Sequence, residues 1–371
     1  MLTRDHPALF STELLAPAAV ASGVLVAASG GPDSMALLDL AARWRNEAAA
    51  RPAVFAATVD HGLREGSRGE AQMVARFASA RGVPHAILDW TGEKPLTRLQ
   101  ERARDARYGL LVAQARCVGA NFILTAHHAD DQAETILMRL LRGSAVPGLA
   151  GMTSLSERGG LTLFRPLLGV RKAGLVLHCE SQGVPFVNDP SNENPRFGRT
   201  RARRLARLLE TEGLGPQEWA RLARRAARAE AALDFAVQAS LTTHPDLPDG
   251  SLSMDMLRAL PEEVALRRLA ARACAAGGSE TVRLSRVEAA WDRLARARSA
   301  GEALGLTLGG ARIGLDRRGL LTFSPEPPRR RGQACAMALQ SVHANGEKSA
   351  GQGSGVNCRT GASLGNGGQR A

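Results

Sequence analysis

The feature that most constrains the fold is an alternation of short apolar runs and helical patterns in the first half of the chain. The run at 24–28 passes through a glycine-rich turn into helical spacing over 35–50. Strands separated by helices form parallel sheets that helices cover on both faces. The order then repeats, with apolar runs at 53–59, 86–90 and 122–125 and helical patterns at 70–80, 97–118 and 130–142. The sequence therefore predicts an α/β fold with a parallel sheet.

Polar side chains gather where three of these predicted strands end. The clusters occupy residues 29–34, 60–61 and 127–131. Parallel strands end at the same edge of a sheet, and ligands of such sheets bind at the carboxyl ends of the strands. We therefore expect the three clusters to form one site.

The first cluster has the composition of a loop that binds phosphate groups. Two glycines let backbone N–H groups approach an anion, and the start of the next helix adds the positive end of a helix dipole. Asp33 would repel phosphate directly, so its natural task is to hold Mg²⁺ against it. The alternative is that Asp33 or Ser34 simply caps the helix. The expected phosphate-binding residues are Ser29, Gly30, Gly31, Pro32, Asp33 and Ser34.

The stretch SGGPDS after an apolar strand resembles the pyrophosphate-binding loop of the PP-loop ATP pyrophosphatases. Over about residues 20–205 the chain resembles, more narrowly, the tRNA(Ile)-lysidine synthetase family. The motifs are VDHGLR at 59–64, ERARDARY at 101–108, TAHHADDQAET at 125–135, RGS at 142–144, GLAGM at 148–152, RPLL at 165–168 and NDPSN at 188–192. One departure is Thr200, because family members commonly carry Arg-Asn-Arg where this chain has Arg-Thr-Arg.

The resemblance implies an ATP-dependent ligase that modifies RNA. In that family, ATP adenylates the C2 oxygen of the wobble cytidine in the CAU anticodon of tRNA(Ile). The amine of free L-lysine then displaces AMP and gives lysidine, which changes the specificity from Met to Ile. The resemblance also implies that the glycine-rich loop binds ATP, that His61 frames the adenine through its backbone, and that Mg²⁺ is required.

Two carboxylates are the first catalytic candidates. Asp131 begins a helix at a strand end, where it can share Mg²⁺ with Asp33 or position the nucleophile. The matching Asp of the family lies in the reaction centre, and helix capping is the alternative role. Asp130 has the same ambiguity of spacing.

Basic and acidic side chains near the clusters complete the expected site. Arg104 and Arg107 are three residues apart and share a helix face, and the resemblance favours Arg107 as the catalytic one. His127 is expected to bind phosphate or to stabilise the adenylated oxygen. Glu134 is a candidate for holding the ammonium group of lysine.

Positive charge is concentrated in parts of the chain, whose formal net charge is +12. Residues 195–230 hold 10 basic and 4 acidic side chains, whereas residues 1–194 hold 20 and 19. Four arginines between 221 and 228 follow helical spacing and form one stripe. Such a stripe contacts nucleic-acid phosphates or is a solvated helix face. We expect tRNA contacts from Arg199, Arg201, Arg221, Arg224, Arg225 and Arg228.

The chain is expected to have three parts. Residues 1–195 form the ATP-binding catalytic domain, residues 196–328 a mostly helical tRNA-binding module with a small hairpin, and residues 329–371 a disordered, basic Gly/Ser-rich tail. In the second part, helices are predicted at 254–275 and 284–300 and the hairpin at 303–323. No apolar run reaches the ~20 residues that span a bilayer, so we expect a cytoplasmic protein without a membrane partner. The sequence does not define the oligomeric state.

Two other functions compete with the ligase. A tRNA thiolase of the same superfamily would need a persulfide-bearing Cys or an iron–sulfur site, but the five cysteines are isolated and lie outside the three clusters. A non-catalytic module that binds ATP or RNA would predict a damaged loop, yet Ser29, Asp33 and Asp131 are all present.

Overall fold

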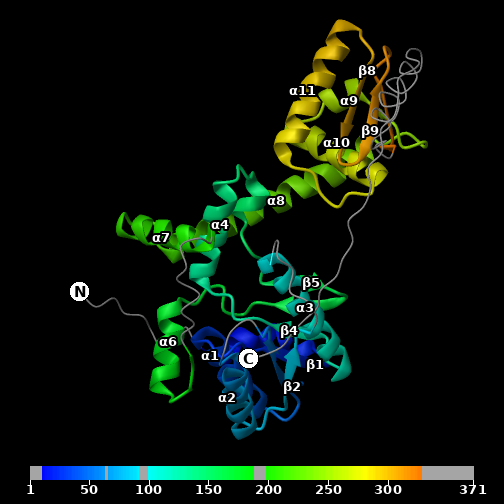
Figure 1. Ribbon diagram of the computed structural model, residues 1–371. Helices are drawn as coiled ribbons and strands as arrows, with labels where there is room; N and C mark the ends of the chain where they lie inside the picture. Colours follow the sequence, from blue (N-terminus) through cyan, green and yellow to red (C-terminus); the bar gives the residue numbers. More distant parts are fainter. Residues whose placement is uncertain (1–10, 63–65, 92–98, 188–197, 328–371) are drawn as a thin grey trace, which may run out of the picture.

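The computed structural model describes residues 11–62, 66–91, 99–187 and 198–327. Two lobes, each with its own sheet, are joined by a long helix (Figure 1). Both predicted domain boundaries, near 195 and 328, and the predicted tail lie outside the described residues and stay predictions.

The sheet of the larger lobe has six strands in the order β3-β2-β1-β4-β6-β5. All neighbours pair in parallel except β5, which is antiparallel to β6. The chain moves outward from β1 to β3 and then returns to the other side of β1, so the strand order reverses between β1 and β4. Ligands bind at such reversals. The strands are β1 Gly23–Ala27, β2 Ala53–Asp60, β3 His85–Asp89, β4 Phe122–Leu124, β5 Leu155–Arg158 and β6 Leu161–Phe164.

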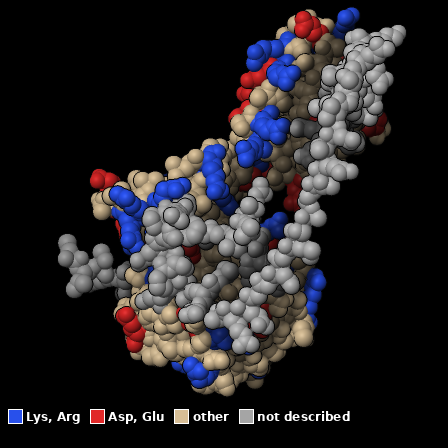
Figure 2. All heavy atoms as spheres, in the orientation of Figure 1, with Lys and Arg blue, Asp and Glu red and all other residues tan. Residues whose placement is uncertain are grey.

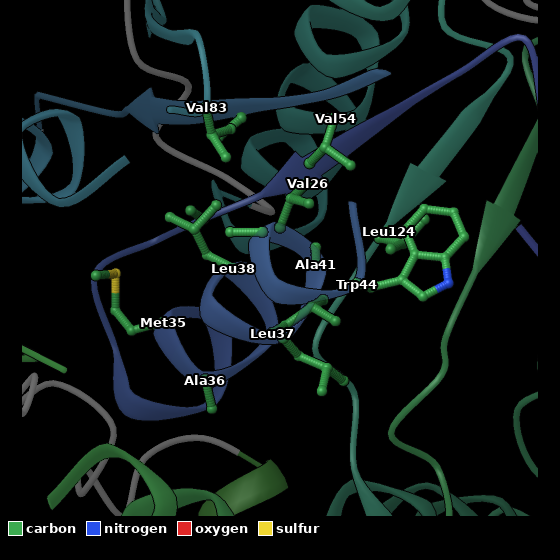
Figure 3. Packing of buried hydrophobic residues seen from close by; sticks show 14 of the residues in the cluster. Val26, Met35, Ala36, Leu37, Leu38, Ala41, Trp44, Val54, Val83 and Leu124 are labelled. Carbon is green, nitrogen blue, oxygen red and sulfur yellow. The ribbon is translucent and has the colours of Figure 1, made fainter. Parts of the chain in front are cut away.

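Helices cover both faces of this sheet because the residues of its central strand, β1, are apolar and buried on both faces. Val24 and Val26 of β1 belong to the core that includes α1, α2 and α6, whereas Leu25 and Ala27 belong to the core beneath α3. Figure 3 shows Leu38 and Trp44 of α1 packed beside the strand residues of the first core. Burying each large apolar side chain stabilises the fold by about 1.5–3 kcal/mol. The helices are α1 Pro32–Asn46, α2 Ser67–Ala80, α3 Leu99–Cys117, α4 Ala129–Leu140, α5 Val146–Leu149 and α6 Lys172–Ser181.

The α/β prediction for the larger lobe is confirmed, since every strand and helix predicted up to residue 142 is present within a few residues of its expected bounds. The hairpin of β5 and β6 was not predicted, because its strands are short and only partly buried. The 3-10 helix η2, Thr12–Val20, which packs on α1, was also missed.

The smaller lobe contains more β structure than predicted. Its sheet has four antiparallel strands in the order β7-β10-β9-β8, where a hairpin alone was expected. The helix predicted at 254–275 is two helices, because Pro261 stands at the N-cap of α10 with an extended ψ of 135°. The elements are β7 Leu252–Ser253, α9 Met254–Arg258, α10 Glu262–Gly277, α11 Leu284–Ala300, β8 Leu304–Leu308, β9 Ala311–Leu315 and β10 Leu320–Pro325.

Two helices lie between these sheets in the chain. They are α7, Gly198–Thr211, and α8, Pro216–Thr243, and Gly213 has a φ of 90° in the turn that separates them. With 28 residues, α8 is about 42 Å long. It contacts α4 and α5 in the larger lobe and α10 in the smaller one. None of the helices in the described part of the chain is long and apolar enough to cross a membrane.

Candidate active site

A cavity of about 440 Å³ lies at the carboxyl ends of β1 and β2, and we call it the first cavity. Ala57 of β2 and Leu111 of α3 contribute apolar wall, whereas Ser29, His61 and Arg107 contribute polar groups. A cavity with apolar walls and a few polar groups is typical of a binding site for a small organic ligand. Ser29 of the first predicted cluster and both residues of the second, Asp60 and His61, therefore line one cavity at the strand ends.

The glycine-rich loop is held by hydrogen bonds among its own residues. The Ser29 N–H donates to Ser34 Oγ at 3.0 Å, and that hydroxyl donates to the Gly31 carbonyl, also at 3.0 Å. Gly30 has a φ of +85°, which strains any residue with a Cβ atom. Its carbonyl accepts a bond of 2.9 Å from the Val187 N–H. Ser34 thus shapes the loop, and its predicted phosphate contact stays a prediction.

A buried histidine joins the third cluster to the first. The Nε2 atom of His128 lies 3.5 Å from Asp33 Oδ2 and 3.4 Å from Asp131 Oδ2. The two predicted carboxylates, one from the start of α1 and one from the start of α4, therefore meet at a single nitrogen. Asp131 also accepts a bond of 3.2 Å from the His128 N–H, so it caps α4 as well. Asp33 Oδ1 is buried and has no hydrogen-bond partner among the described residues.

These carboxylates set the charge of His128. Burial lowers the pKa of this imidazole, but hydrogen bonds to Asp130 and Asp33 and the charge of Asp131 outweigh burial and raise the pKa to about 10. For Asp130, burial raises the carboxyl pKa, but His128 and the Lys172 N–H lower it to about 2. Asp130 is thus engaged in contacts within the protein, because its Oδ2 atom accepts a hydrogen bond of 2.9 Å from the Lys172 N–H. The site combines an imidazolium with three carboxylates.

His127, the histidine expected from sequence to act in the site, is placed differently from its neighbour His128. His127 is half-buried, and its Nδ1 atom lies 3.0 Å from Thr125 Oγ1. Its predicted contact with phosphate stays a prediction. The sequence signal for His128 was its position directly before the helix that begins at Ala129.

The structure separates the two arginines that share a face of α3. Arg107 lines the first cavity, where burial lowers the pKa of its guanidinium. Arg104 is exposed and stacks over Tyr108, with 5.5 Å from its Cζ atom to the ring centroid. The catalytic role expected for Arg107 stays a prediction. His61 lines the same cavity, and its ring meets Trp90 edge to face with centroids 5.7 Å apart.

A second cavity, of about 80 Å³, adjoins His128 on the side of α4, α7 and α8. Glu134, which is 2% exposed, accepts a bond of 2.6 Å from Arg203 Nε, while its Oε2 atom is buried without a partner among the described residues. Arg203 of α7 is thus half-buried and paired with a buried carboxylate, unlike the exposed Arg201 of the same helix. The polar lining includes His128, Asp130, Glu134, Lys172, Glu210 and Trp219.

Comparison with known proteins identifies the family. A family model for the PP-loop domain matches residues 8–209. The chain is 52% identical over 319 residues to the tRNA(Ile)-lysidine synthase of Methylobacterium sp. (strain 4-46), covering 84% of this chain and 91% of the relative. It is 50% identical over 339 residues to that of Methylobacterium nodulans, covering 89% and 98%. This chain belongs to the tRNA(Ile)-lysidine synthase family. A relative from Bradyrhizobium sp. (strain BTAi1) is 43% identical over 351 residues, covering 89% and 98%.

The motifs that resemble the lysidine synthase family fix α4 against its neighbours. The Gln132 side chain donates to the Met152 carbonyl at 2.8 Å and accepts from the Met152 N–H at 2.6 Å. Arg139 donates to the carbonyls of Gly148 and Gly151 at 3.2 and 2.8 Å. A Cβ atom on Gly151 would lie 2.6 Å from the Gln132 amide oxygen. The TAHHADDQAET and GLAGM motifs therefore contact each other directly, and these contacts hold α4 in place.

The basic stripe lies on the outer face of α8. All four of its arginines are exposed, whereas Trp219, Ala223 and Ala226 on the opposite side are buried. Figure 2 shows Lys and Arg side chains along the joint between the lobes and up the edge of the smaller lobe. Arg201 is exposed on α7, and the side chain of Arg199 lies outside the described residues. The stripe members are Arg221, Arg224, Arg225 and Arg228.

Proposed function

We propose that this chain joins free L-lysine to C2 of the wobble cytidine of tRNA(Ile) with a CAU anticodon. The cytidine O2 atom attacks the α-phosphorus of ATP and releases diphosphate. The lysine amine then attacks C2, loses a proton, and releases AMP. The observation that carries the proposal is identity of 50% or more, over at least 84% of this chain, to two tRNA(Ile)-lysidine synthases. We place the reaction in the cytoplasm, where tRNA and free lysine meet.

ATP is assigned to the first cavity. Its adenine lies against the apolar wall near Ala57 and Leu111, with His61 framing the ring, and its phosphates lie on the loop from Ser29 to Ser34. Arg107, in the same cavity, stabilises the negative charge that develops on the polyphosphate. The positive end of the α1 dipole favours the same charge.

Mg²⁺ is assigned to Asp33 and Asp131. The two carboxylates approach one nitrogen, and Asp33 Oδ1 is a buried acceptor without a partner in the described chain, which suits a cation. No group of three acidic, His or Cys side chains in the described residues could hold a metal ion. This fits an ion that binds one or two carboxylates and completes its shell with phosphate oxygens and water. When bound, Mg²⁺ would neutralise charge on the phosphates.

Lysine is assigned to the second cavity. The free Oε2 atom of Glu134 would accept a hydrogen bond from an ammonium group of the amino acid. His128 lines this cavity and contacts both Asp33 and Asp131, so lysine bound there would adjoin the reacting cytidine. His127, on the same loop, would stabilise the adenylated oxygen.

The tRNA is assigned to the exposed arginines of α7 and α8. Each phosphate contact releases counterions, so binding would weaken with salt. The contacts are assigned to Arg199, Arg201, Arg221, Arg224, Arg225 and Arg228.

The test combines the full chain, ATP, Mg²⁺, labelled lysine and a transcript of tRNA(Ile) with a CAU anticodon. We expect label in the tRNA and one AMP per lysine incorporated. A transcript with a GAU anticodon is the matched control, because it lacks the wobble cytidine. Equal labelling of both transcripts, or of neither, would contradict the proposal.

The rival thiolase finds little support in the described cysteines. Cys179 is buried, its thiol donates to the Pro32 carbonyl, and burial raises its pKa to about 12, so it stays protonated. Neither Cys117 nor Cys274, the other described cysteines, lines either cavity. A thiolase would transfer sulfur to the tRNA without consuming lysine, and the same assay detects that difference.

A further inference from the structure

We propose that Trp219 of α8 binds the lysine substrate, with its indole N–H donating a hydrogen bond to the carboxylate of the amino acid. The proposal rests on the proposed function and adds a specificity-determining residue to it.

The first argument is an unused donor. Trp219 is 3% exposed, and its Nε1 atom is buried without a hydrogen-bond partner among the described residues. A buried indole N–H normally has a partner, because leaving it unpaired costs about 1–3 kcal/mol. A ligand that accepts this hydrogen bond would remove that cost.

The second argument is the space beside it. Trp219 lines the second cavity, whose volume of about 80 Å³ is several times the roughly 10–15 Å³ that one water needs. The cavity therefore has room for the polar end of a small molecule.

The third argument is chemical complementarity. Free lysine carries an α-ammonium donor and a carboxylate acceptor on one carbon. Among the residues that line the second cavity, Glu134 Oε2 is a buried acceptor and Trp219 Nε1 is a buried donor, each without a partner in the described chain. The other donors of this lining are engaged or exposed. Arg203 donates to Glu134 Oε1, both ring nitrogens of His128 lie within 3.5 Å of carboxylates, and Lys172 and Arg207 are exposed. The two unused groups match the two groups of an α-amino acid, and Trp219 is assigned to the carboxylate.

The test is Trp219→Phe, which removes the N–H and keeps an aromatic ring in the apolar contact. We expect the KM for L-lysine to rise at least about tenfold, as for a lost hydrogen bond to a charged group. The KM for ATP should stay unchanged, because Trp219 does not line the first cavity. Trp291→Phe, at a buried tryptophan of the smaller lobe, is the matched control and should leave both values unchanged.

A lysine analogue separates a hydrogen bond to the carboxylate from a change of shape. 1,5-Diaminopentane lacks the carboxylate, so its inhibition constant against lysine should be the same in the wild type and in Trp219→Phe. An unchanged KM for lysine in the variant, or an equal rise in the inhibition constant of the diamine, would overturn the proposal. If the wild-type chain incorporated no lysine, the proposed function would fall and this proposal with it.

Discussion

The two cavities of the larger lobe differ in what holds their walls in place. The first is built largely on the ends of β1 and β2, whose parallel register pairs Gly23 with Ala53 and Ala27 with Ala57. The second lies between α4, α7 and α8, which meet around a small core that includes Ile136 and Trp219. The sheet thus fixes the cavity proposed to bind ATP, whereas helix packing fixes the cavity proposed to bind lysine.

This difference predicts which properties change together. Helix α8, which lines the second cavity, also carries the basic stripe on its outer face. Changes in α8 should therefore affect lysine and tRNA, and changes at the strand ends should affect ATP. His128 lines the second cavity and contacts Asp33 of the glycine-rich loop, whose Ser29 lines the first cavity, so changes at the carboxylates around His128 should affect both.

The largest effect is expected at the carboxylates around His128. Asp33→Asn and Asp131→Asn should each lower lysine incorporation at least about 100-fold, because the charge that stabilises the reaction centre is lost. Asp89→Asn, at an exposed carboxylate paired with Arg68, is the control and should stay active. Incorporation of labelled lysine and thermal unfolding are measured together. A folded variant with full activity would remove that carboxylate from the site.

The next effect isolates the first cavity. Arg107→Ala should lower kcat/KM for ATP by roughly 10–100-fold, because charge developing on the phosphates loses its partner. The KM for lysine should not change. Arg104→Ala is the matched control, since Arg104 is exposed on the same helix and does not line the cavity. A rise in the KM for lysine in Arg107→Ala would show that the two cavities are not independent.

A smaller effect is expected on the outer face of α8. Replacing the four stripe arginines by Gln should weaken tRNA binding at least about tenfold at low salt and lower the salt slope by up to about 4. The KM for ATP should be unaffected. The control replaces exposed arginines of the smaller lobe, Arg312, Arg317 and Arg318. Equal loss per charge in both sets would mean that α8 has no special role in binding.

The smallest effect concerns stability and pH. The folded pKa of His128 is about 10, above its ordinary value of 6.5. Because the pKa is raised in the folded state, protonated His128 stabilises the fold fully below pH 6.5, and this contribution is lost as the pH rises toward 10. The free energy of unfolding is measured for the wild type and for His128→Gln in the absence of Mg²⁺ and ATP. The wild type should be the more stable of the two, and the difference between them should shrink as the pH rises. A difference that grew with pH would contradict the assigned ion pairs.

Much of the first cavity could be predicted from sequence, because strand ends are local features. The apolar runs in the sequence indicate the positions of β1 and β2. Polar residues that follow these strands, including Ser29 and His61, line the cavity. The second cavity could not be predicted in this way, because Trp219 and Glu134 are 85 residues apart and meet through helix packing. The same limit applies to the adjacent histidines, His127 and His128. The turn before α4 determines which imidazole is buried, and the spacing of residues along the sequence does not define that turn.

The hydrogen bond between the Gly30 carbonyl and the Val187 N–H determines when the glycine-rich loop can reach its final geometry during synthesis of the chain. The ribosome makes the donor that holds this carbonyl 157 residues after the glycine-rich loop. At the slower end of translation rates, about 5–20 residues per second, that interval lasts tens of seconds. A nascent chain therefore carries the complete loop sequence well before the loop can acquire its final geometry.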